Sequence, residues 1–304
     1  MNTRAALFAI AAGFLLAAAP CAGRTAAVAP LPATLAETGL FEPGTLEASA
    51  ANQPFAPAYP LWSDGMDKRR WLHIPAGAAI DKSDPDAWVF PVGTRAWKEF
   101  RREGRVETRF IERLTDGSWR FASYVWNAEG TRALLAPDDG IASKGIPSRA
   151  DCLACHEGAP VPILGYSAVQ LSKDAIAGPT PTTRAVLGYL HGNCSHCNND
   201  SALPALDLSL AQSAARPQES AARALITLVG RYGRYRGADS AETRRVRPGH
   251  ADESMLLARL KSHDPLVRMP PIGVSVVDER AVTLIERWIA QDLRNATTTK
   301  AQEK

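Results

Sequence analysis

The stretch VETRFIERLTDGSWRFASYVW occupies residues 106–126. Residues 106–114 and 118–126 each have the composition and alternation of a β-strand. Between them, Thr115-Asp116-Gly117-Ser118 supplies the turn chemistry of a tight hairpin, because Asp and Gly tolerate the backbone angles that such turns need. The stretch therefore predicts two antiparallel strands.

Further strands are expected on the N-terminal side of this hairpin, at residues 71–74 and 88–92. Six of the seven tryptophans lie before residue 130, and we interpret these aromatic side chains as core. Residues 95–113 interleave Arg with Glu, a pattern that usually indicates a solvated face. Together these features predict an antiparallel β domain over residues 58–145.

After residue 146 the pattern becomes helical and rich in loops. Helices are expected at residues 183–189, 221–232, 253–261 and 279–293, and a short helical element near residues 31–40. The last helix carries an apolar stripe and begins after a suitable N-cap, Asp278. The predicted fold class is therefore α+β and multidomain, with residues 146–182 between the β domain and a mostly α domain over residues 183–295. The members of the stripe are Val282, Ile285, Ile289 and Leu293.

The N-terminus has the layout of a secretory signal: Arg4, an apolar run over residues 5–19, then Pro20 and small residues. We expect a signal peptide over residues 1–24, a loose lead-in over 25–57 and a disordered tail over 296–304. The protein is thus expected to be periplasmic or otherwise exported. Cys21 follows Pro20, which fits a lipidation signal poorly, so no lipid anchor is expected.

The composition is that of a globular protein, with 304 residues, 45% hydrophobic and 22% charged. A formal net charge of +3 is small for this length and argues against nucleic acid as a partner. No segment after the signal is long and apolar enough to predict a membrane span. Oligomeric state is not predicted.

Four of the five cysteines form two close pairs, and the first pair is Cys152-Leu153-Ala154-Cys155-His156. C-x-x-C-H is the pattern of covalent haem attachment: each thiol bonds one vinyl group, and the histidine supplies the proximal nitrogen to the iron. A disulfide would leave His156 without a role, and a zinc knuckle needs four ligands. The motif therefore predicts haem c at Cys152, Cys155 and His156.

The second pair, Cys194-Ser195-His196-Cys197-Asn198, has Asn where the proximal histidine is expected. Three interpretations remain open. The pair holds a second haem whose axial ligand comes from elsewhere, such as His191. Alternatively, Cys194 and Cys197 form a disulfide, or His191, Cys194, His196 and Cys197 bind a metal ion.

Met269-Pro270-Pro271 bears on this choice, because a methionine on a Pro-rich loop suits the soft sixth ligand of a haem iron. A methionine can also fill a core, but two following prolines make that role a poor fit here. The loop favours a haem at Cys194 and Cys197 with Met269 as iron ligand. The sixth ligand opposite His156 is left open among His73, His250, His263 and Met66.

Residues 183–293 resemble a class I cytochrome c domain, with a helix ending in the attachment motif, a Met-Pro-Pro loop and a C-terminal helix with an Ile/Trp face. The longer stretch from Tyr59 resembles exported proteins in which a β domain precedes two c-type haem motifs. The segments YPLWSDG (59–65), FPVGT (90–94), WKEF (97–100) and LGYSAVQL (164–171) carry this likeness. The resemblance implies two haems, and Asn198 departs from its second motif.

Electron transfer to a redox partner protein is the leading functional hypothesis, since no other catalytic motif stands out. The first alternative is a haem enzyme, for example peroxidase-like, or a small-ligand sensor with an open iron position. The second is a partner-docking module with an accessory haem. Its docking surface would be the basic loop, which carries Arg231, Arg234, Arg236, Arg244, Arg245 and Arg247; these cations could instead pair with haem propionates or be solvated.

Overall fold

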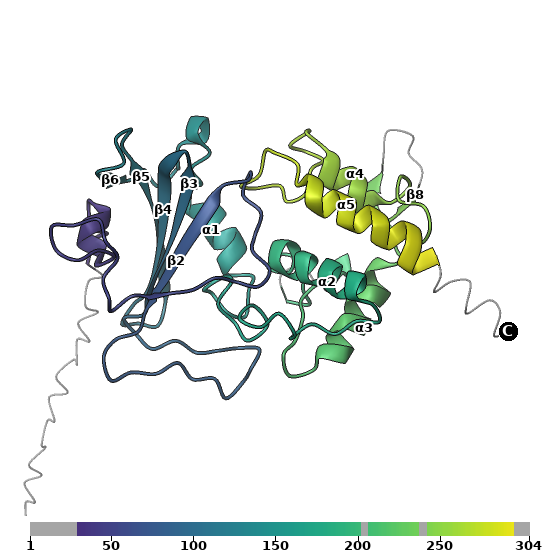
Figure 1. The fold of residues 1–304 in the computed structure, drawn as a ribbon, viewed down its shortest axis with the longest axis horizontal. Coiled ribbons are helices and arrows are strands. Elements are labelled where there is room, and N and C mark those ends of the chain that lie inside the picture. The colour runs from purple at the N-terminus through teal and green to yellow at the C-terminus, as the bar shows by residue number, and fades with distance from the viewer. Residues whose placement is uncertain (1–28, 202–205, 237–241, 295–304) are drawn as a thin grey trace, which may run out of the picture. The chain divides into compact units, whose positions relative to one another are not determined.

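A computed structural model describes residues 29–201, 206–236 and 242–294 of the chain. From Leu31 onward the chain forms one compact unit. Within the described residues, a six-stranded antiparallel sheet comes first, followed by five α-helices and a small two-stranded ribbon (Figure 1). The α+β class predicted from the sequence is confirmed.

The sheet is a meander in which each strand pairs with the next one along the chain. The connections from β3 to β4 and from β4 to β5 are tight turns, as antiparallel neighbours allow, whereas the longer segments 55–66 and 74–94 connect β1 to β2 and β2 to β3. The strands are β1 (Gln53–Pro54), β2 (Asp67–His73), β3 (Arg95–Arg102), β4 (Gly104–Arg113), β5 (Trp119–Trp126) and β6 (Ala133–Leu135).

The hairpin predicted at residues 106–126 is confirmed as β4 and β5. Leu114 donates its N–H to the Ser118 carbonyl at 2.8 Å, and Gly117 adopts a left-handed φ of 84° in the turn. The strand predicted at residues 88–92 is wrong. Only an isolated bridge joins Asp81 to Val89, because Pro91 interrupts the run and cannot donate to a ladder.

One face of the sheet is covered by the residues just after Leu31. The 3₁₀ turn η1 (Leu35–Thr38) and Leu40 pack there against Trp97 and Tyr124, and Leu35 and Leu40 are fully buried. The Trp97 indole N–H donates to the Thr38 hydroxyl at 2.9 Å. Residues 25–57 were expected to form a loose lead-in with a short helical element near residues 31–40. The helical element is present as η1, and Leu35 and Leu40 of this segment belong to a hydrophobic core.

The other face of the sheet carries Leu72, Ala96, Ile111 and Phe121, which form a second core. Residues that follow the sheet in the sequence pack on this core, among them Cys152, Leu153, Ile163 and Tyr166. This face therefore carries the segment that contains the first cysteine pair.

The mixed charges of residues 95–113 do not form a solvated face, so that interpretation is wrong. Glu99 and Glu107 are 1% and 3% exposed. Arg105 pairs with Glu99 at 3.0 Å, and Arg109 pairs with Glu107. Each buried carboxylate is thus neutralised by an arginine close to it on the same sheet.

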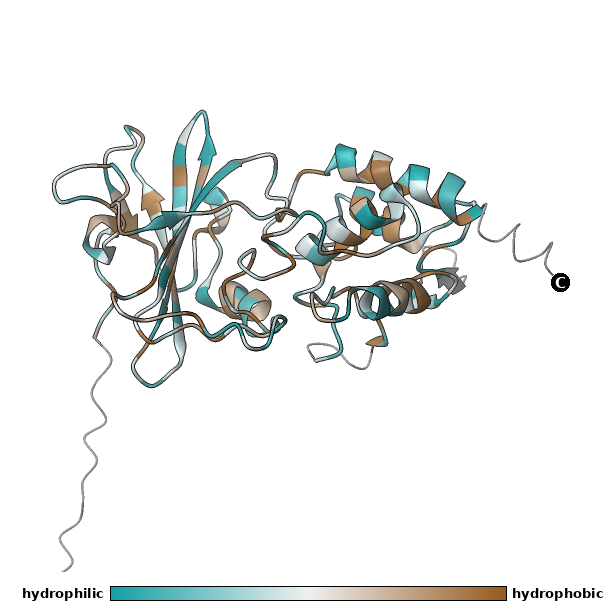
Figure 2. Ribbon diagram, turned by 60° about the horizontal axis from the view of Figure 1, so that its bottom comes forward, coloured by the Kyte–Doolittle hydropathy of each residue, from teal (hydrophilic) through white to brown (hydrophobic). Residues whose placement is uncertain are grey.

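The C-terminal half consists of helices whose hydrophobic faces meet (Figure 2). The helix predicted at 221–232 ends early, because Gly230 takes a left-handed φ of 72° and Tyr232 begins a strand. The helices are α1 (Arg149–His156), α2 (Pro181–Cys194), α3 (Pro217–Leu228), α4 (Met255–Lys261) and α5 (Glu279–Arg287), which continues as a π-helical turn (Trp288–Asp292); the ribbon is β7 (Tyr232–Arg236) and β8 (Glu242–Arg244).

The predicted stripe on the last helix is the centre of this half. Val282, Ile285 and Ile289 are buried against α2, together with Trp288. The Trp288 indole N–H donates to the Thr183 hydroxyl at 3.1 Å, so the polar end of a buried indole is satisfied. Asp278 caps α5 through the Ala281 N–H, as predicted.

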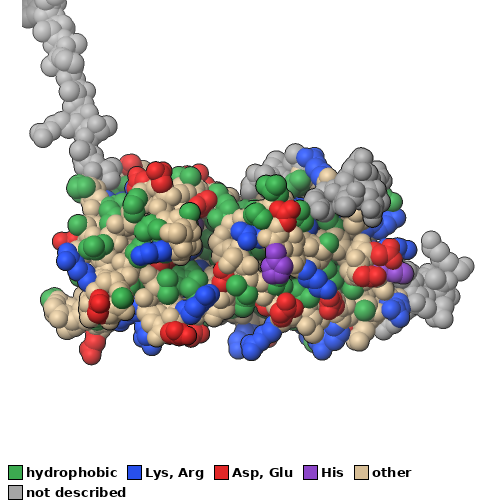
Figure 3. Space-filling view, turned by 90° about the horizontal axis from the view of Figure 1, so that it is seen from above, with side chains coloured by type: hydrophobic (Ala, Val, Ile, Leu, Met, Phe, Trp, Pro, Cys, Tyr) green, Lys and Arg blue, Asp and Glu red, His purple; other side chains and the backbone are tan. Residues whose placement is uncertain are grey.

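Several expectations fall on residues that the structure does not describe: the signal peptide at 1–24, Cys21 and the tail at 296–304. Among the described residues, no helix combines the length and the hydrophobicity that crossing a bilayer requires. Cationic and anionic side chains are interspersed on the face drawn in Figure 3. This mixture agrees with the small net charge.

Replacing Ile285 by Ala should lower the free energy of unfolding by about 2–5 kcal/mol, because the side chain is fully buried and a cavity would remain. Ile226, on α3, is 59% exposed, so Ile226→Ala should change stability by no more than about 0.5 kcal/mol. Urea denaturation followed by tryptophan fluorescence measures both. Equal losses for the two variants would contradict the assigned core.

Candidate functional site

The first cysteine pair lies in the last turns of α1, a helix of eight residues. Ser148 and Asp151 form a capping box: the Ser148 hydroxyl accepts from the Asp151 N–H at 3.1 Å, and the Ser148 N–H donates to the Asp151 carboxylate at 2.9 Å. The cap fixes where the helix begins. Cys152, Cys155 and His156 therefore follow within two turns, and α1 packs against β5.

His156 is held by a backbone carbonyl and an aromatic ring. Its Nδ1 lies 2.6 Å from the Pro162 carbonyl oxygen, and its ring centroid is 4.8 Å from that of Phe121. Because Nδ1 must carry the proton for this hydrogen bond, Nε2 keeps its lone pair. Burial lowers the pKa of His156 to about 4, so the imidazole is neutral at neutral pH. A neutral imidazole with Nε2 available is the form that ligates metals.

The second pair lies at the end of α2, whose start is fixed by Thr180 as N-cap and Pro181 in the first turn. At the other end, Asn198 donates to the Cys194 carbonyl through both its backbone N–H, at 2.9 Å, and its side-chain amide, at 3.1 Å. The residue in the position of the missing histidine thus closes the helix end.

The two pairs meet in space. The thiols of Cys155 and Cys197 share a hydrogen bond, and the Cys197 sulfur lies 4.0 Å from the Ala154 carbonyl oxygen. All four thiols of the described chain are free. The Cys155 thiol donates to Cys197, which lowers the pKa of Cys197 to about 7 and raises the pKa of Cys155. Burial raises the pKa of Cys194 to about 12.

One cavity of about 390 Å³ is lined by all four thiols, and we call it the thiol cavity. Its size is within the range of ligand pockets. His156 and Met269 line it as well, and much of the remaining wall is apolar, including Phe121, Ile163 and Leu210. The sequence-predicted site residues are therefore brought together: Cys152, Cys155, His156, Cys194, Cys197 and Met269 all line the thiol cavity.

Residues 59–64, which we call the strap, form hydrogen bonds both to α2 and to the loop that follows Met269. The Trp62 N–H donates to the Asn193 side chain at 2.7 Å, and the Trp62 indole donates to the Val276 carbonyl at 2.8 Å. The carboxylate of Asp64 accepts from the N–H groups of Ser275 and Val276 at 2.8 and 2.9 Å. The loop that begins at Met269 is thus anchored at its far end to the segment that precedes β2.

The residues considered as sixth ligands opposite His156 lie elsewhere. His73, His250, His263 and Met66 are not among the described residues that line the thiol cavity. His196, which was considered only for a metal site, does line it. His196 is 9% exposed, and burial lowers its pKa. Its position between the two cysteines of the second motif is the sequence signal that could have identified it.

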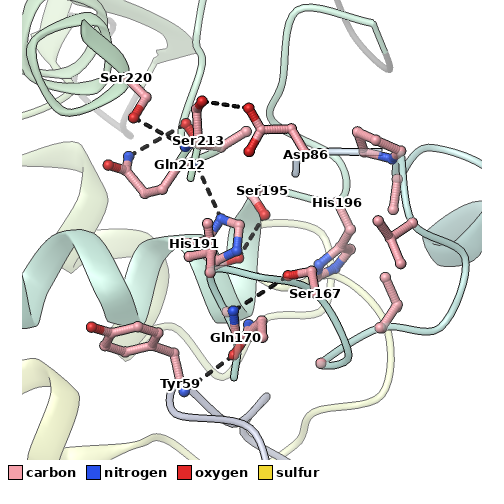
Figure 4. A pocket seen from close by; sticks show the side chains of 18 of the residues that line it. Tyr59, Asp86, Ser167, Gln170, His191, Ser195, His196, Gln212, Ser213 and Ser220 are labelled. Atoms are coloured by element: carbon pink, nitrogen blue, oxygen red, sulfur yellow. Dashed lines mark hydrogen bonds between the residues drawn. The ribbon is translucent and has the colours of Figure 1, made fainter. Parts of the chain in front are cut away.

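A second cavity, of about 540 Å³, adjoins the first and shares His196 with it; we call it the polar cavity (Figure 4). His191 lines the polar cavity and not the thiol cavity. Its Nδ1 accepts the Gln212 N–H at 3.1 Å, and burial lowers its pKa to about 4. The structure therefore does not bring His191 to Met269.

Cationic side chains reach the thiol cavity from two sides. Arg234, Arg245 and Arg259 come from the helical half, and Arg70, Lys98 and Arg109 come from the sheet. Two of the first three belong to the basic loop of the sequence. Lys98 and Arg109 were missed because residues 95–113 were interpreted as solvated. Arg70 was not singled out in the sequence, and the signal for all three is that directly paired residues of neighbouring strands share one face of the sheet.

Comparison with family models, with curated proteins and with solved structures finds no match for this chain. Among the described residues, no cluster of three or more His, Cys, Asp or Glu side chains could hold a metal ion. His191, Cys194, His196 and Cys197 thus do not assemble as a metal site. What the arrangement offers is paired thiols, two imidazoles (His156 and His196) and one thioether around an apolar space.

We expect iodoacetamide to modify Cys197 faster than Cys194 in chain produced without haem attachment. At pH 8 Cys197 is above its pKa of about 7 and is mostly thiolate, whereas Cys194, with a pKa of about 12, stays protonated and unreactive. The Cys197 rate should fall as the pH drops through 7. Peptide mass spectrometry over time measures both rates. Cys155→Ala removes the donated hydrogen bond and should slow Cys197 at pH 7; equal rates for Cys194 and Cys197 would contradict the assignment.

Proposed function

We propose that this protein is an exported c-type cytochrome that transfers electrons to a redox partner protein. Its haem is attached through Cys152 and Cys155, and His156 is the proximal iron ligand. One observation carries the proposal. The C-x-x-C-H motif lies at the end of a helix, and both of its thiols and the His156 side chain line a largely apolar cavity. Because Nδ1 of His156 is hydrogen-bonded to the Pro162 carbonyl, Nε2 is the nitrogen that can bind a ligand.

The residues present fit a haem. The cavity wall is mainly hydrophobic, as an aromatic macrocycle requires. Arg70 and Lys98, which have no ion pair among the described residues, also line it and could meet its carboxylates. The Nδ1 hydrogen bond of His156 orients the ring and raises the basicity of Nε2, which is the usual arrangement for a metal-ligating histidine. Phe121 restricts the imidazole from one side.

A bound haem c supplies one-electron exchange between ferric and ferrous iron. The chain's own residues set the conditions of that exchange. Cys152 and Cys155 tether the group, and the capped helix α1 fixes the distance between them. Apolar side chains exclude water from the cavity, which together with the axial ligands adjusts the reduction potential.

For Cys194 and Cys197 we propose a second haem with Met269 as one axial ligand. The support is that both thiols and Met269 line the same cavity, and that the thiols are not joined as a disulfide. His191 lies outside this cavity, so of the two histidines His196 is the one that could help Met269 to hold the group. Asn198 closes the helix end and is not needed as a ligand.

A haem enzyme or small-ligand sensor is the second candidate function. It is favoured by the polar cavity that adjoins the thiol cavity and shares His196 with it. An iron without a sixth protein ligand would be five-coordinate and high-spin. Absorption and resonance Raman spectra that show only six-coordinate low-spin haem would exclude this second function and retain electron transfer.

Cys155→Ala or His156→Ala should abolish or strongly disturb the main haem spectrum, because each change removes a covalent or axial bond to the haem. Ala154→Ser is the matched control, since residue 154 is exposed and lies between the two thiols. Intact mass and haem staining of the mature chain measure the outcome. An unaltered chain without haem mass, or normal haem in both variants, would refute the proposed function.

Asn198→His should raise the low-spin signal without changing the number of haems, because it restores a proximal imidazole to the second motif. Met269→Leu should lower the reduction potential of the second haem, since thioether ligation raises it. Met66→Leu serves as control, because Met66 does not line the thiol cavity. A mature mass with one haem and a Cys194–Cys197 disulfide would exclude the second site.

A further inference from the structure

Three cations form a row across the sheet. Arg70 on β2 is directly opposite Lys98 on β3, and Lys98 is directly opposite Arg109 on β4. Directly opposed side chains of antiparallel strands have Cβ atoms about 5 Å apart, and like charges at that spacing repel. Arg109 is neutralised by Glu107, but the row still holds two further positive charges.

Arg70 is the most isolated of the three. It is 7% exposed, and within the described residues its guanidinium has neither a hydrogen bond nor an ion pair. Lys98 likewise lacks an ion pair there, and its ammonium group lies 4.7 Å from the centre of the Phe100 ring. Burying an unpaired charge is costly. The pKa values agree: burial lowers the pKa of Arg70 to about 10 and that of Lys98 well below its usual range.

Arg70 and Lys98 each line both the thiol cavity and the polar cavity, so a ligand in either space could contact them. Among the described residues, none of the acidic side chains that line these cavities forms a hydrogen bond or an ion pair with Arg70 or Lys98; each has other partners. Asp86 accepts hydrogen bonds from Ser213 and Ala214, Asp151 from Ser148; Asp200 pairs with Arg223 at 3.0 Å, and Glu219 pairs with Arg216 at 3.7 Å.

We propose that Arg70 and Lys98 form a carboxylate-binding site on the face of the sheet, at the junction of the thiol cavity and the polar cavity. An arginine fork matches the two oxygens of a carboxylate, and the neighbouring ammonium adds a second donor. The carboxylate has two sources, a haem propionate or a free small carboxylic acid. The first source rests on the proposed function, whereas the second does not.

The test uses the full chain as purified, in unaltered form and as Arg70→Gln. Arg69→Gln is the matched control: Arg69 is the neighbouring residue on β2, is exposed, and points to the opposite face of the sheet. Intact mass counts the attached haems, which tests the proposed function separately. Two further readouts are the midpoint potential of the haem and a calorimetric titration with succinate.

If a haem propionate is the ligand, Arg70→Gln should shift the midpoint potential to more negative values, because a positive charge near the iron favours the reduced state. If a free acid is the ligand, succinate should bind the unaltered chain, and Arg70→Gln should weaken binding by about tenfold to a hundredfold, the effect of losing a charged hydrogen bond. Arg69→Gln should change neither readout.

The proposal is overturned if Arg70→Gln matches Arg69→Gln in both readouts. If the purified chain carries no haem, only the succinate titration can test the proposal. The proposal is then overturned if the unaltered chain does not bind succinate. If the Arg70→Gln variant does not fold, Lys98→Gln replaces it in the test, because Lys98 lines the same two cavities. The same two outcomes apply to it.

Discussion

A helix of eight residues is not stable by itself in water, so α1 depends on contacts at both of its ends. The capping box of Ser148 and Asp151 fixes the first turn, and the hydrogen bond from His156 to the Pro162 carbonyl fixes the last. Between these ends, Cys152 and Leu153 pack on the sheet. The positions of two thiols and one imidazole follow from these few contacts, which explains why the sheet and the first motif belong to one compact unit.

The same dependence extends to the second motif. Because Cys155 is the last thiol of α1 and Cys197 follows the end of α2, their hydrogen bond joins the sheet-bound helix to the helical half. The hydrogen bond of Asn199 to the Gly158 carbonyl, at 2.8 Å, reinforces this junction. Two haems attached to these pairs would lie close together, and such proximity suits electron exchange between them. The two sites are therefore better regarded as one unit than as independent modules.

The sequence predicted the local features well and the long-range ones poorly. The hairpin at residues 106–126, the stripe on the last helix and the cap at Asp278 depend on neighbours in the chain, and all three are present. β3 was missed because its Arg and Glu residues suggested a solvated surface, whereas pairing on both edges buries Glu99. Periodicity cannot reveal such pairing, since the neutralising arginines belong partly to another strand.

The site shows the same division. The motif predicted Cys152, Cys155 and His156 as a haem-attachment site without any structure, because such attachment needs three residues at fixed spacing. Which distant residues share their cavity depends on how strands and helices pack. Met269 was inferred from its prolines and does line the cavity, whereas His191 does not, although it is three residues from Cys194. Closeness in sequence does not predict which cavity a side chain lines here, because His191 of α2 lines the polar cavity whereas Cys194 lines the thiol cavity.

Two glycines explain how the strap over residues 59–64 can approach α2 closely enough to anchor the Met269 loop. A Cβ at Gly188 would lie 2.1 Å from the ring of Tyr59, and a Cβ at Gly192 would lie 2.2 Å from the Tyr59 carbonyl oxygen. Any side chain at Gly192 would displace backbone, so the strap would move away from Asn193 and lose the hydrogen bond that holds Trp62. Trp62 and Asp64 in turn hold Val276 and Ser275. Gly188 and Gly192 therefore let the strap lie close to α2, and the strap in turn positions Ser275 and Val276 at the end of the Met269 loop. The two glycines thus influence the position of this loop without contacting Met269 themselves.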